Sequence, residues 1–380
     1  MWVVIAGGGT AGHVHPGLAV ARALVRRGCE SESIRFVGSV RGVERDLVPA
    51  AGFELTMLPG RGIERRLSRL SWQNLSALWG LVRAGVRAGY LLGRLRPAVV
   101  LALGGYASLP CALAARLLWI PVVVAEQNAV PGVANRLSGR WARASAVSFP
   151  GTELPRPVLT GNPVRAEVQA VDRDRDRDCA RAALGVDRRR RLVVVVGGSL
   201  GAARINRAAF EAARFWADRD DLTLYHVVGR RDWQDLAPLR PDLAGALLDY
   251  RAVEFEENMP GVYAAADLLV GRAGATSVAE LALVGLPSVL VPLPWAPGDH
   301  QTANAAGLVA AGGAVLVRDG EMDGRRMAAE VDRLLAAPEL LASMGRAAAG
   351  LGHRDADNQV VDLLQKWARH PREGGGMRPQ

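Results

Sequence analysis

The first 24 residues contain the feature that most restricts the fold of this chain. A short apolar run at residues 3–6 is followed by three glycines and then by an apolar segment of helical periodicity at residues 17–24. This order predicts a buried strand, a tight loop and a helix, which together make one βα unit. Glycine lets the backbone turn sharply and approach a ligand, and the N-terminus of a helix favours negative charge. We therefore interpret the loop as a binding site for a phosphorylated ligand.

A titratable side chain, His13, lies beside this glycine loop. Because an imidazole titrates near neutral pH, the same stretch could bind an anion and move a proton. In the alternative interpretation, His13 only caps or packs at the start of the helix. We interpret His15, His226 and His353 as structural or exposed residues.

The pattern of strand, glycine loop and helix occurs again in the second half of the chain. An apolar run at residues 192–196 leads into the glycine-containing stretch 197–203 and a helix that ends near Phe215. The further strands that we expect cover residues 34–38, 98–103, 121–125, 222–228, 253–255, 268–270, 288–291 and 314–317. The predicted fold is of the α/β class, with two doubly wound, Rossmann-like domains that face each other across a cleft.

The length of the chain, 380 residues, suits two domains of ordinary size. Glycine and proline within residues 159–165 are suited to a hinge. We therefore expect an N-terminal domain over residues 1–163 and a C-terminal domain over residues 164–346. A helix at about residues 347–368 is expected to pack back on the N-terminal domain.

Charge and composition limit the partners and the location of the protein. The net charge of +9 and the isoelectric point near 10.3 indicate anionic partners, such as nucleic acid, anionic lipid or nucleotide-linked substrates. No apolar run approaches the roughly 20 residues that span a bilayer, and the start lacks the basic region of a secretory signal. We expect a cytoplasmic protein. Its cysteines, Cys29, Cys111 and Cys179, are widely spaced, which fits reduced thiols with no assigned chemistry.

Asp and Arg alternate over residues 172–178. An Asp-x-Asp pair can hold a divalent ion, but strictly alternating charges without an apolar partner are typical of a solvated loop. We expect a solvated loop here and no metal site.

Residues 60–96 contain many arginines and no strand pattern. On a helix, one apolar stripe would hold Trp72, Leu75, Trp79, Val82, Val86 and Tyr90. Arginines cluster along one edge of the stripe, which suits a helix on an anionic membrane surface. For residues 75–94 we favour instead a helix that packs on the sheet with a solvated arginine face. Residues 61–72 are the better candidate for a membrane contact.

Short motifs in chain order give the sequence a more specific resemblance. They are residues 8–14, 104–106, 126–128, 161–165, 197–199, 272–280 and 299–304. Together they resemble the bacterial MurG family of peptidoglycan synthesis, which adds N-acetylglucosamine to lipid I. The resemblance implies the GT-B fold, UDP-N-acetylglucosamine as donor and lipid I as acceptor. It also implies formation of lipid II with inversion at the anomeric carbon, without a metal or other cofactor.

The resemblance and the chemistry of the residues together predict a donor site. The helix that follows Gly274 could hold the donor diphosphate at its N-terminus, and Glu280 could accept hydrogen bonds from ribose hydroxyls. The family carries an apolar residue where Glu256 stands, so a contact to uracil through its backbone is expected. The implied donor-binding residues are Thr10, Ala11, Gly12, Asn128, Arg165, Ser199, Phe255, Glu256, Ala275, Thr276, Glu280, Gln301 and Asn304.

On the acceptor side, a general base must take the proton of the attacking C4 hydroxyl. We expect His13 to be that base, with Glu126 as the alternative. The family often has glycine where Ala11 stands, which puts any need for a positive φ there in doubt. Tyr106 could instead belong to the core. The implied acceptor-binding residues are Gly9, Thr10, Gly12, Gly105 and Tyr106.

Three other functions compete with this one. A GT-B transferase with another lipid acceptor, such as diacylglycerol, is disfavoured by the motifs at 104–106 and 126–128. An NAD-linked oxidoreductase would need an acidic residue after the second strand, where Gly38 and Ser39 stand. A protein that binds a nucleotide sugar without catalysing transfer could be distinguished from a transferase only by an activity assay. The expected partners are UDP-N-acetylglucosamine, lipid I and cell-wall synthesis proteins. We also expect peripheral binding to an anionic membrane surface on the cytoplasmic side, and no binding of nucleic acid.

Overall fold

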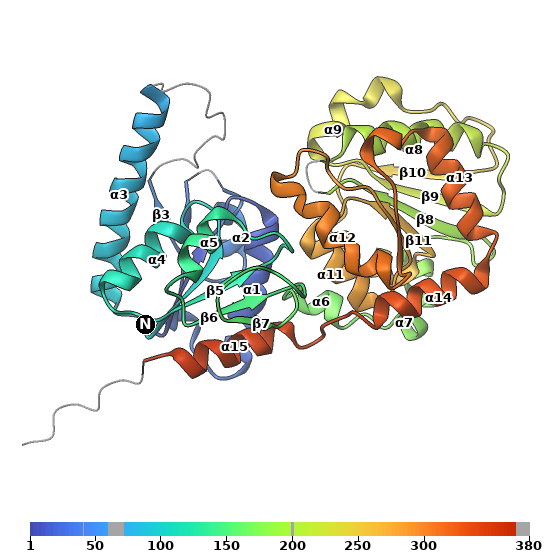
Figure 1. The fold of residues 1–380 in the computed structure, drawn as a ribbon. Coiled ribbons are helices and arrows are strands. Elements are labelled where there is room, and N and C mark those ends of the chain that lie inside the picture. Colours follow the sequence, from blue (N-terminus) through green and yellow to red (C-terminus); the bar gives the residue numbers. More distant parts are fainter. Residues whose placement is uncertain (41, 60–71, 199–200, 370–380) are drawn as a thin grey trace, which may run out of the picture. The chain divides into compact units, whose positions relative to one another are not determined.

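The computed structural model describes residues 1–40, 42–59, 72–198 and 201–369, and within helix α3 (Trp72–Leu95) it describes side chains from Trp79 onward. The chain divides into two compact units (Figure 1). The first unit comprises Met1–Arg165 with Asp355–Gln380, and the second comprises Ala166–Arg354. Each unit has its own parallel sheet and its own hydrophobic core.

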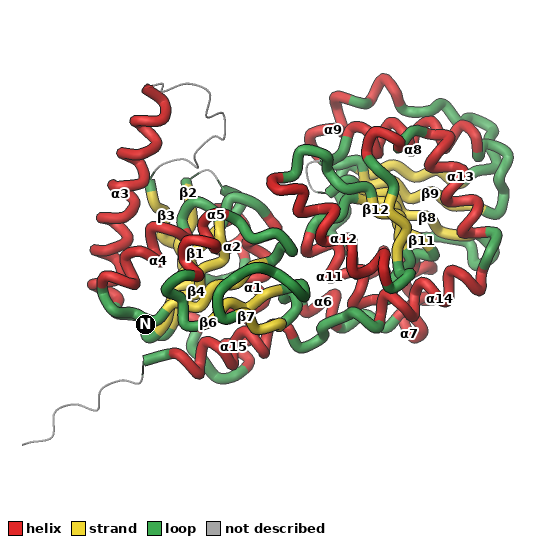
Figure 2. The backbone as a smooth tube through the Cα atoms, in the orientation of Figure 1, coloured by secondary structure: helices red, strands yellow, loops and turns green. Residues whose placement is uncertain are grey.

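The first unit is built on a seven-stranded parallel sheet in the order β3-β2-β1-β4-β5-β6-β7. Its strands are β1 (Val3–Gly7), β2 (Ile34–Ser39), β3 (Glu54–Leu58), β4 (Val99–Gly104), β5 (Val122–Glu126), β6 (Ala144–Val147) and β7 (Pro157–Leu159). Besides α3, its helices are α1 (Ala11–Arg26), α2 (Glu44–Ala50), α4 (Ser108–Leu117), α5 (Val133–Gly139) and α15 (Ala356–Trp367). Helices cover both faces of the sheet (Figure 2), so the central strands β1 and β4 are apolar and buried throughout.

Helix α15 brings the end of the described chain back onto the first unit. Val360, Val361 and Leu364 belong to the same core cluster as β1. An ion pair also joins α15 to α1, because a guanidinium nitrogen of Arg26 in α1 lies 2.6 Å from the carboxylate of Asp357 in α15. Apolar packing and an ion pair therefore both join α15 to α1.

The second unit contains a six-stranded parallel sheet in the order β10-β9-β8-β11-β12-β13. Its strands are β8 (Arg191–Val196), β9 (Leu222–Val227), β10 (Asp249–Val253), β11 (Leu268–Gly271), β12 (Ser288–Leu290) and β13 (Ala314–Leu316). Its α-helices are α6 (Ala166–Gln169), α7 (Arg173–Ala183), α8 (Ala203–Phe215), α9 (Arg230–Asp235), α10 (Met259–Ala265), α11 (Ala275–Val284), α12 (His300–Ala310), α13 (Gly324–Leu335) and α14 (Pro338–Ala349). Residues of α8, α13 and the central strands form its main core cluster.

These topologies confirm the predicted α/β class and the doubly wound parallel sheets. The direction of winding changes between β1 and β4 in the first sheet and between β8 and β11 in the second. Ligands of such sheets bind at the carboxyl ends of the strands at these positions. The motifs at residues 8–14 and 104–106 follow β1 and β4, and those at 197–199 and 272–280 follow β8 and β11. The fold therefore brings most of the motifs to the expected edges.

Several local predictions were wrong or incomplete. The strand predicted over residues 253–255 is β10, which spans Asp249–Val253 and ends where the prediction begins. Strands β3, β6 and β7 were not predicted at all. Both β3 and β7 are edge strands, and the residues of β7 are all exposed, so neither has the fully buried apolar run of a central strand. Strand β6 is short and consists mainly of small residues.

The solvated loop predicted over residues 172–178 is in fact the start of helix α7. Asp172 caps this helix, because its carboxylate accepts hydrogen bonds from the backbone N–H groups of Asp174 and Arg175. Arginines spaced by four residues share one helix face and reach Ala266 and Asp267. In the sequence, the strict alternation of Asp and Arg made the four-residue spacing of these arginines hard to recognise.

Helix α3 packs in the first unit, but not through the face that we favoured. Ala84, Ala88 and Leu92 are fully buried and join a core cluster that contains residues of the sheet. From Trp79 onward the predicted apolar stripe instead faces solvent, with Val86 and Tyr90 each 71% exposed. Because alanine is small, the helix can approach its neighbours closely on this face. A search for the largest apolar side chains does not predict that the alanine face is the one that packs. No helix among the described residues is long and apolar enough to cross a membrane.

Candidate active site

In the first unit, the loop after β1 lies directly against the loop after β4. Gly104 and Gly105 both have positive φ, 95° and 77°. A Cβ atom on Gly105 would lie 2.4 Å from the carbonyl oxygen of Gly8, and one on Gly104 would lie 3.2 Å from Nε2 of His13. The two loops therefore contact each other through their backbones, and only glycine fits at Gly105.

His13 lies in the first turn of α1, half-buried beside these loops. Its Nδ1 is 3.0 Å from the hydroxyl oxygen of Thr10. If Nδ1–H donates to that hydroxyl, Nε2 carries the lone pair and can accept a proton. Helix α1 begins at Ala11, which is not among the residues of positive φ, so glycine is not required at this position.

A buried carboxylate that sequence reasoning missed, Glu44, supports the first glycine loop. Its side chain is 1% exposed and accepts hydrogen bonds from the backbone N–H of Gly9 at 2.8 Å and of Ser39 at 2.7 Å. The Ser39 hydroxyl donates a third bond at 3.0 Å. Glu44 takes up the Gly9 amide, so a contact of this amide with an acceptor pyrophosphate would compete with the bond to Glu44. The exposed Thr10 and Gly12 remain placed for such a contact.

Glu126, at the end of β5, is a second buried carboxylate. It accepts hydrogen bonds from the backbone N–H groups of Asn128 and Gly132, both at 3.0 Å, and from the side-chain amide of Asn135 at 2.9 Å. These donors occupy the carboxylate, and Glu126 therefore holds the loop that contains Asn128. Tyr106 is half-buried and donates to the carbonyl oxygen of Pro59 at 3.0 Å, and burial raises the pKa of its hydroxyl.

In the second unit, helix α11 begins with its backbone N–H groups uncapped by any side chain. Gly274 is the N-cap residue and offers no side chain, and the buried hydroxyl oxygen of Thr276 has no hydrogen-bond partner among the described residues. Together with Ala275, these groups suit an anion such as a diphosphate. Glu280, one turn further and 6% exposed, accepts a hydrogen bond from the Tyr263 hydroxyl at 2.9 Å.

The amide residues predicted for the sugar differ in their surroundings. Asn304 is fully buried and donates to the carbonyl oxygen of Ala273 at 3.2 Å, so it supports the turn before α11 and does not present its amide at a surface. Gln301 is half-buried, and its side-chain oxygen accepts a hydrogen bond from the backbone N–H of Leu293 at 2.9 Å. Of this pair, Gln301 is the more exposed.

The segment expected to contact uracil follows β10. The ring of Phe255 is 39% exposed and lies 4.3 Å from the guanidinium carbon of Arg230. The carboxylate of Glu256 accepts hydrogen bonds from the Tyr225 hydroxyl and the backbone N–H of Asn258. The side chain of Glu256 is thus held by its own neighbours, which fits an expected contact through its backbone.

For two predicted donor-binding residues, Ser199 and Arg165, the structure gives little or no detail. Ser199 lies outside the described residues. Arg165 is half-buried and ends the first part of the first unit. The remaining predicted residues of the first unit lie at or just after the ends of β1, β4 and β5, and those of the second unit lie after β10, on α11 and on α12.

A buried polar network lies behind the β8 loop in the second unit. The ring of His226 contacts the Tyr250 hydroxyl and the side-chain oxygen of Asn206, each at 3.0 Å. Asn206 in turn donates to Asp232 at 3.0 Å, and a Cβ on Gly201 would lie 2.6 Å from that carboxylate. The network therefore supports the described end of the glycine loop at residue 201.

His226 makes the stability of this network dependent on pH. Burial, and to a smaller extent the charge of Arg240, lower the pKa of His226 to about 3, whereas the unfolded chain has a value of about 6.5. Between these values only the unfolded chain binds the proton, so stability is lost as the pH falls below 6.5, by about 1.4 kcal/mol per pH unit. Urea unfolding at pH 7 and pH 5 should show a larger loss for the native chain than for His226→Gln. Equal losses in the two proteins would contradict this assignment.

Comparisons with known proteins assign both halves of the chain to glycosyltransferase domains. Residues 3–147 match the glycosyltransferase family 28 N-terminal domain, and residues 192–360 match the glycosyltransferase family 28 C-terminal domain. The fold and the matched domains define a glycosyltransferase of the GT-B type. Within the described residues, no group of three or more His, Cys, Asp and Glu side chains is placed to hold a metal ion.

Full-length relatives narrow this class further. Proteins from Acidothermus cellulolyticus and Streptomyces coelicolor are 42% and 39% identical, over 97% and 96% of this chain and 98% and 97% of their own length. Both are named UDP-N-acetylglucosamine–N-acetylmuramyl-(pentapeptide) pyrophosphoryl-undecaprenol N-acetylglucosamine transferase. A crystal structure of MurG from Acinetobacter baumannii is 31% identical, with a TM-score of 0.75 over 96% of this chain and 99% of that one. The chain belongs to glycosyltransferase family 28 and, within it, to the MurG family.

Proposed function

We propose that this chain transfers N-acetylglucosamine from UDP-N-acetylglucosamine to the C4 hydroxyl of the N-acetylmuramyl group of lipid I. The products are lipid II and UDP, and the configuration at the transferred sugar is inverted. The observation that carries the proposal is the placement of His13 against two glycine loops at the switch point of the first sheet. The names of the relatives, which cover nearly the whole chain, support the identities of donor and acceptor.

In the proposed reaction, Nε2 of His13 takes the proton of the C4 hydroxyl as its oxygen attacks C1 of the donor sugar. The bond between C1 and the diphosphate oxygen breaks, and its electron pair leaves with UDP. The uncapped N-terminus of α11 stabilises the negative charge on the diphosphate. Glu280 accepts hydrogen bonds from the ribose, and Gln301 binds the sugar.

A transfer assay tests this function. The purified chain is incubated with labelled UDP-N-acetylglucosamine and a lipid I analogue in the presence of EDTA, and in parallel with diacylglycerol as acceptor. We expect label in the lipid I analogue alone and no dependence on added metal. Absence of transfer to this acceptor would reject the proposal, and transfer to diacylglycerol would favour the alternative acceptor.

We also propose that the protein binds the cytoplasmic face of the cell membrane peripherally, through helix α3. Four large apolar side chains on one stripe of α3 are 51–71% exposed, and we call them the α3 stripe: Trp79, Val82, Val86 and Tyr90. Arg83 and Arg87 are exposed on the same helix. The neighbouring α4 and the residues just after it add exposed Leu117 and Trp119. An exposed apolar patch beside arginines suits an anionic lipid surface. The candidate contact at residues 61–72 lies outside the described residues, apart from the backbone of Trp72.

Charged substitutions in the α3 stripe should weaken membrane binding. Because one buried Val or Tyr contributes about 1.5–3 kcal/mol, Val86→Asp with Tyr90→Asp should lower partitioning onto vesicles with anionic phospholipid by more than about tenfold. Co-sedimentation at low salt measures this. Phe215→Asp with Leu247→Asp, at exposed apolar positions of the second unit, is the matched control and should bind as the native chain does. Unchanged pelleting of the α3 variant would reject this membrane surface.

A further inference from the structure

The second unit contains a pocket at the opposite edge of its sheet from the proposed donor residues. Its volume is about 780 Å³, and it is lined by residues of α7, the end of α11 and α14. Arg191 and Asp267 line it where β8 and β11 begin, whereas the donor residues follow the carboxyl ends of these strands. Because the strands are parallel, the two sites lie at opposite edges.

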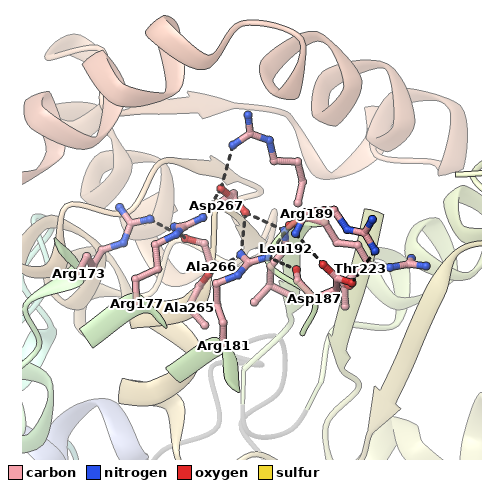
Figure 3. A network of polar contacts seen from close by, with 12 residues as sticks. Arg173, Arg177, Arg181, Asp187, Arg189, Leu192, Thr223, Ala265, Ala266 and Asp267 are labelled. Atoms are coloured by element: carbon pink, nitrogen blue, oxygen red, sulfur yellow. Dashed lines mark hydrogen bonds and ion pairs between the residues drawn. The ribbon is translucent and has the colours of Figure 1, made fainter. Parts of the chain in front are cut away.

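Arginines exceed carboxylates around this pocket. Three aspartates line it, Asp172, Asp174 and Asp267, against five arginines, which we call the arginine rim: Arg173, Arg177, Arg191, Arg346 and Arg354. Asp267, whose side chain is only 7% exposed, already faces three guanidinium groups. Two of them, Arg177 at 2.6 Å and Arg181 at 3.3 Å, are labelled in Figure 3, and the third is Arg191 at 3.4 Å. One carboxylate therefore compensates three cations.

Arg173 lines the pocket and donates hydrogen bonds to uncharged carbonyl groups. Its guanidinium donates to the carbonyl oxygens of Gly285 at 2.8 Å and Ala266 at 2.5 Å. These two residues are the C-cap residues of α11 and α10. Those carbonyls carry no formal charge, and the buried Nε of Arg173 has no hydrogen-bond partner among the described residues. Burial, followed by the like charge of Arg177, lowers the pKa of Arg173 to about 10, and the charges of Asp267 and Asp174 oppose this shift only in part. A bound anion would relieve this imbalance.

Apolar side chains also line the pocket. Val171, Val284, Pro287 and Leu341 line it, and we call them the apolar wall. A doubly charged group suits several arginines, because planar guanidinium groups match the oxygens of phosphate. An apolar wall beside such a rim suits the carbon body of the same ligand.

We propose that this pocket is a second ligand site, which binds an organic phosphate with its phosphate group at the arginine rim and its carbon body against the apolar wall. The site is separate from the transfer reaction and does not depend on it.

Calorimetric titration with phenyl phosphate tests the proposal. The whole chain is titrated without nucleotide, and inorganic phosphate is titrated in parallel; the paired variants described below distinguish binding in this pocket from binding at the proposed donor site. We expect phenyl phosphate to bind, and to bind more tightly than inorganic phosphate, which lacks a carbon body. No binding of phenyl phosphate, or no preference for it over inorganic phosphate, would overturn the proposal.

Paired variants locate the binding. Arg191→Ala with Arg346→Ala removes two residues of the arginine rim and should weaken phenyl phosphate binding by about tenfold or more. The control, Arg318→Ala with Arg325→Ala, removes the same charge from exposed positions outside the pocket and should bind normally. Arg346→Ala alone, at an exposed position of α14, gives the same comparison should the double variant not fold. Equal binding by both double variants, or equal loss in both, would overturn the proposal, and neither result depends on whether the chain transfers sugar.

Discussion

Replacing His13 with alanine is expected to lower the turnover number for transfer to a lipid I analogue by about 100- to 10,000-fold. Without the imidazole, no described group beside the two glycine loops is placed to take the acceptor proton, since Glu126 is occupied by its donors. The dissociation constant for UDP should change little, because the proposed nucleotide contacts lie in the second unit.

His15→Ala is the matched control for this measurement. It removes a second half-buried histidine two residues further along the same helix and should retain most of the activity. Full turnover by His13→Ala, with the control equally active, would remove His13 as the base. Loss of UDP binding in His13→Ala would instead mean that the residue serves the donor.

The second large effect is expected at Glu44. Glu44→Gln places an N–H₂ group against at least one of the donors at Gly9 and Ser39, which leaves buried hydrogen bonds unmade. Since each bond to a buried charged group contributes about 1.5–3 kcal/mol, the free energy of unfolding should fall by roughly 3 kcal/mol. Transfer should fall as well, because the loop that places Thr10 and His13 loses its support.

Urea unfolding measures the loss, and Asp46→Asn provides the comparison. Asp46 lies in the same first turn of α2 but is exposed, so its substitution should change the free energy of unfolding by less than about 0.5 kcal/mol. If Glu44→Gln is as stable as Asp46→Asn, the carboxylate does not hold the glycine loop.

The parts of the site that could be predicted from the sequence depend on local pattern. Apolar runs followed by glycines predicted β1, β8 and the loops after them, and the glycine turn before α11 predicted an uncapped helix start. These features arise within a few residues of one another. The fold then brings them to the switch points of the two sheets, as the order of strands requires.

The parts that could not be predicted depend on contacts between distant residues. Glu44 is an ordinary first-turn carboxylate in sequence, and its role appears only because it reaches Gly9, 35 residues away. The burial of Asn304 under the turn at Ala273 is likewise a tertiary contact. On α3, the alanines that pack could be identified only once neighbouring elements were in place, because an apolar stripe is equally suited to a core or to a lipid surface.

The central claim is that the second unit binds the nucleotide at the start of α11. Amide hydrogen exchange with and without UDP tests this claim most directly. We predict that UDP slows exchange most strongly in peptides that contain residues 253–258 and 272–280 of the full chain, with little change at the pocket of the arginine rim. Protection confined to the glycine loops of the first unit, or to the arginine rim, would contradict the account.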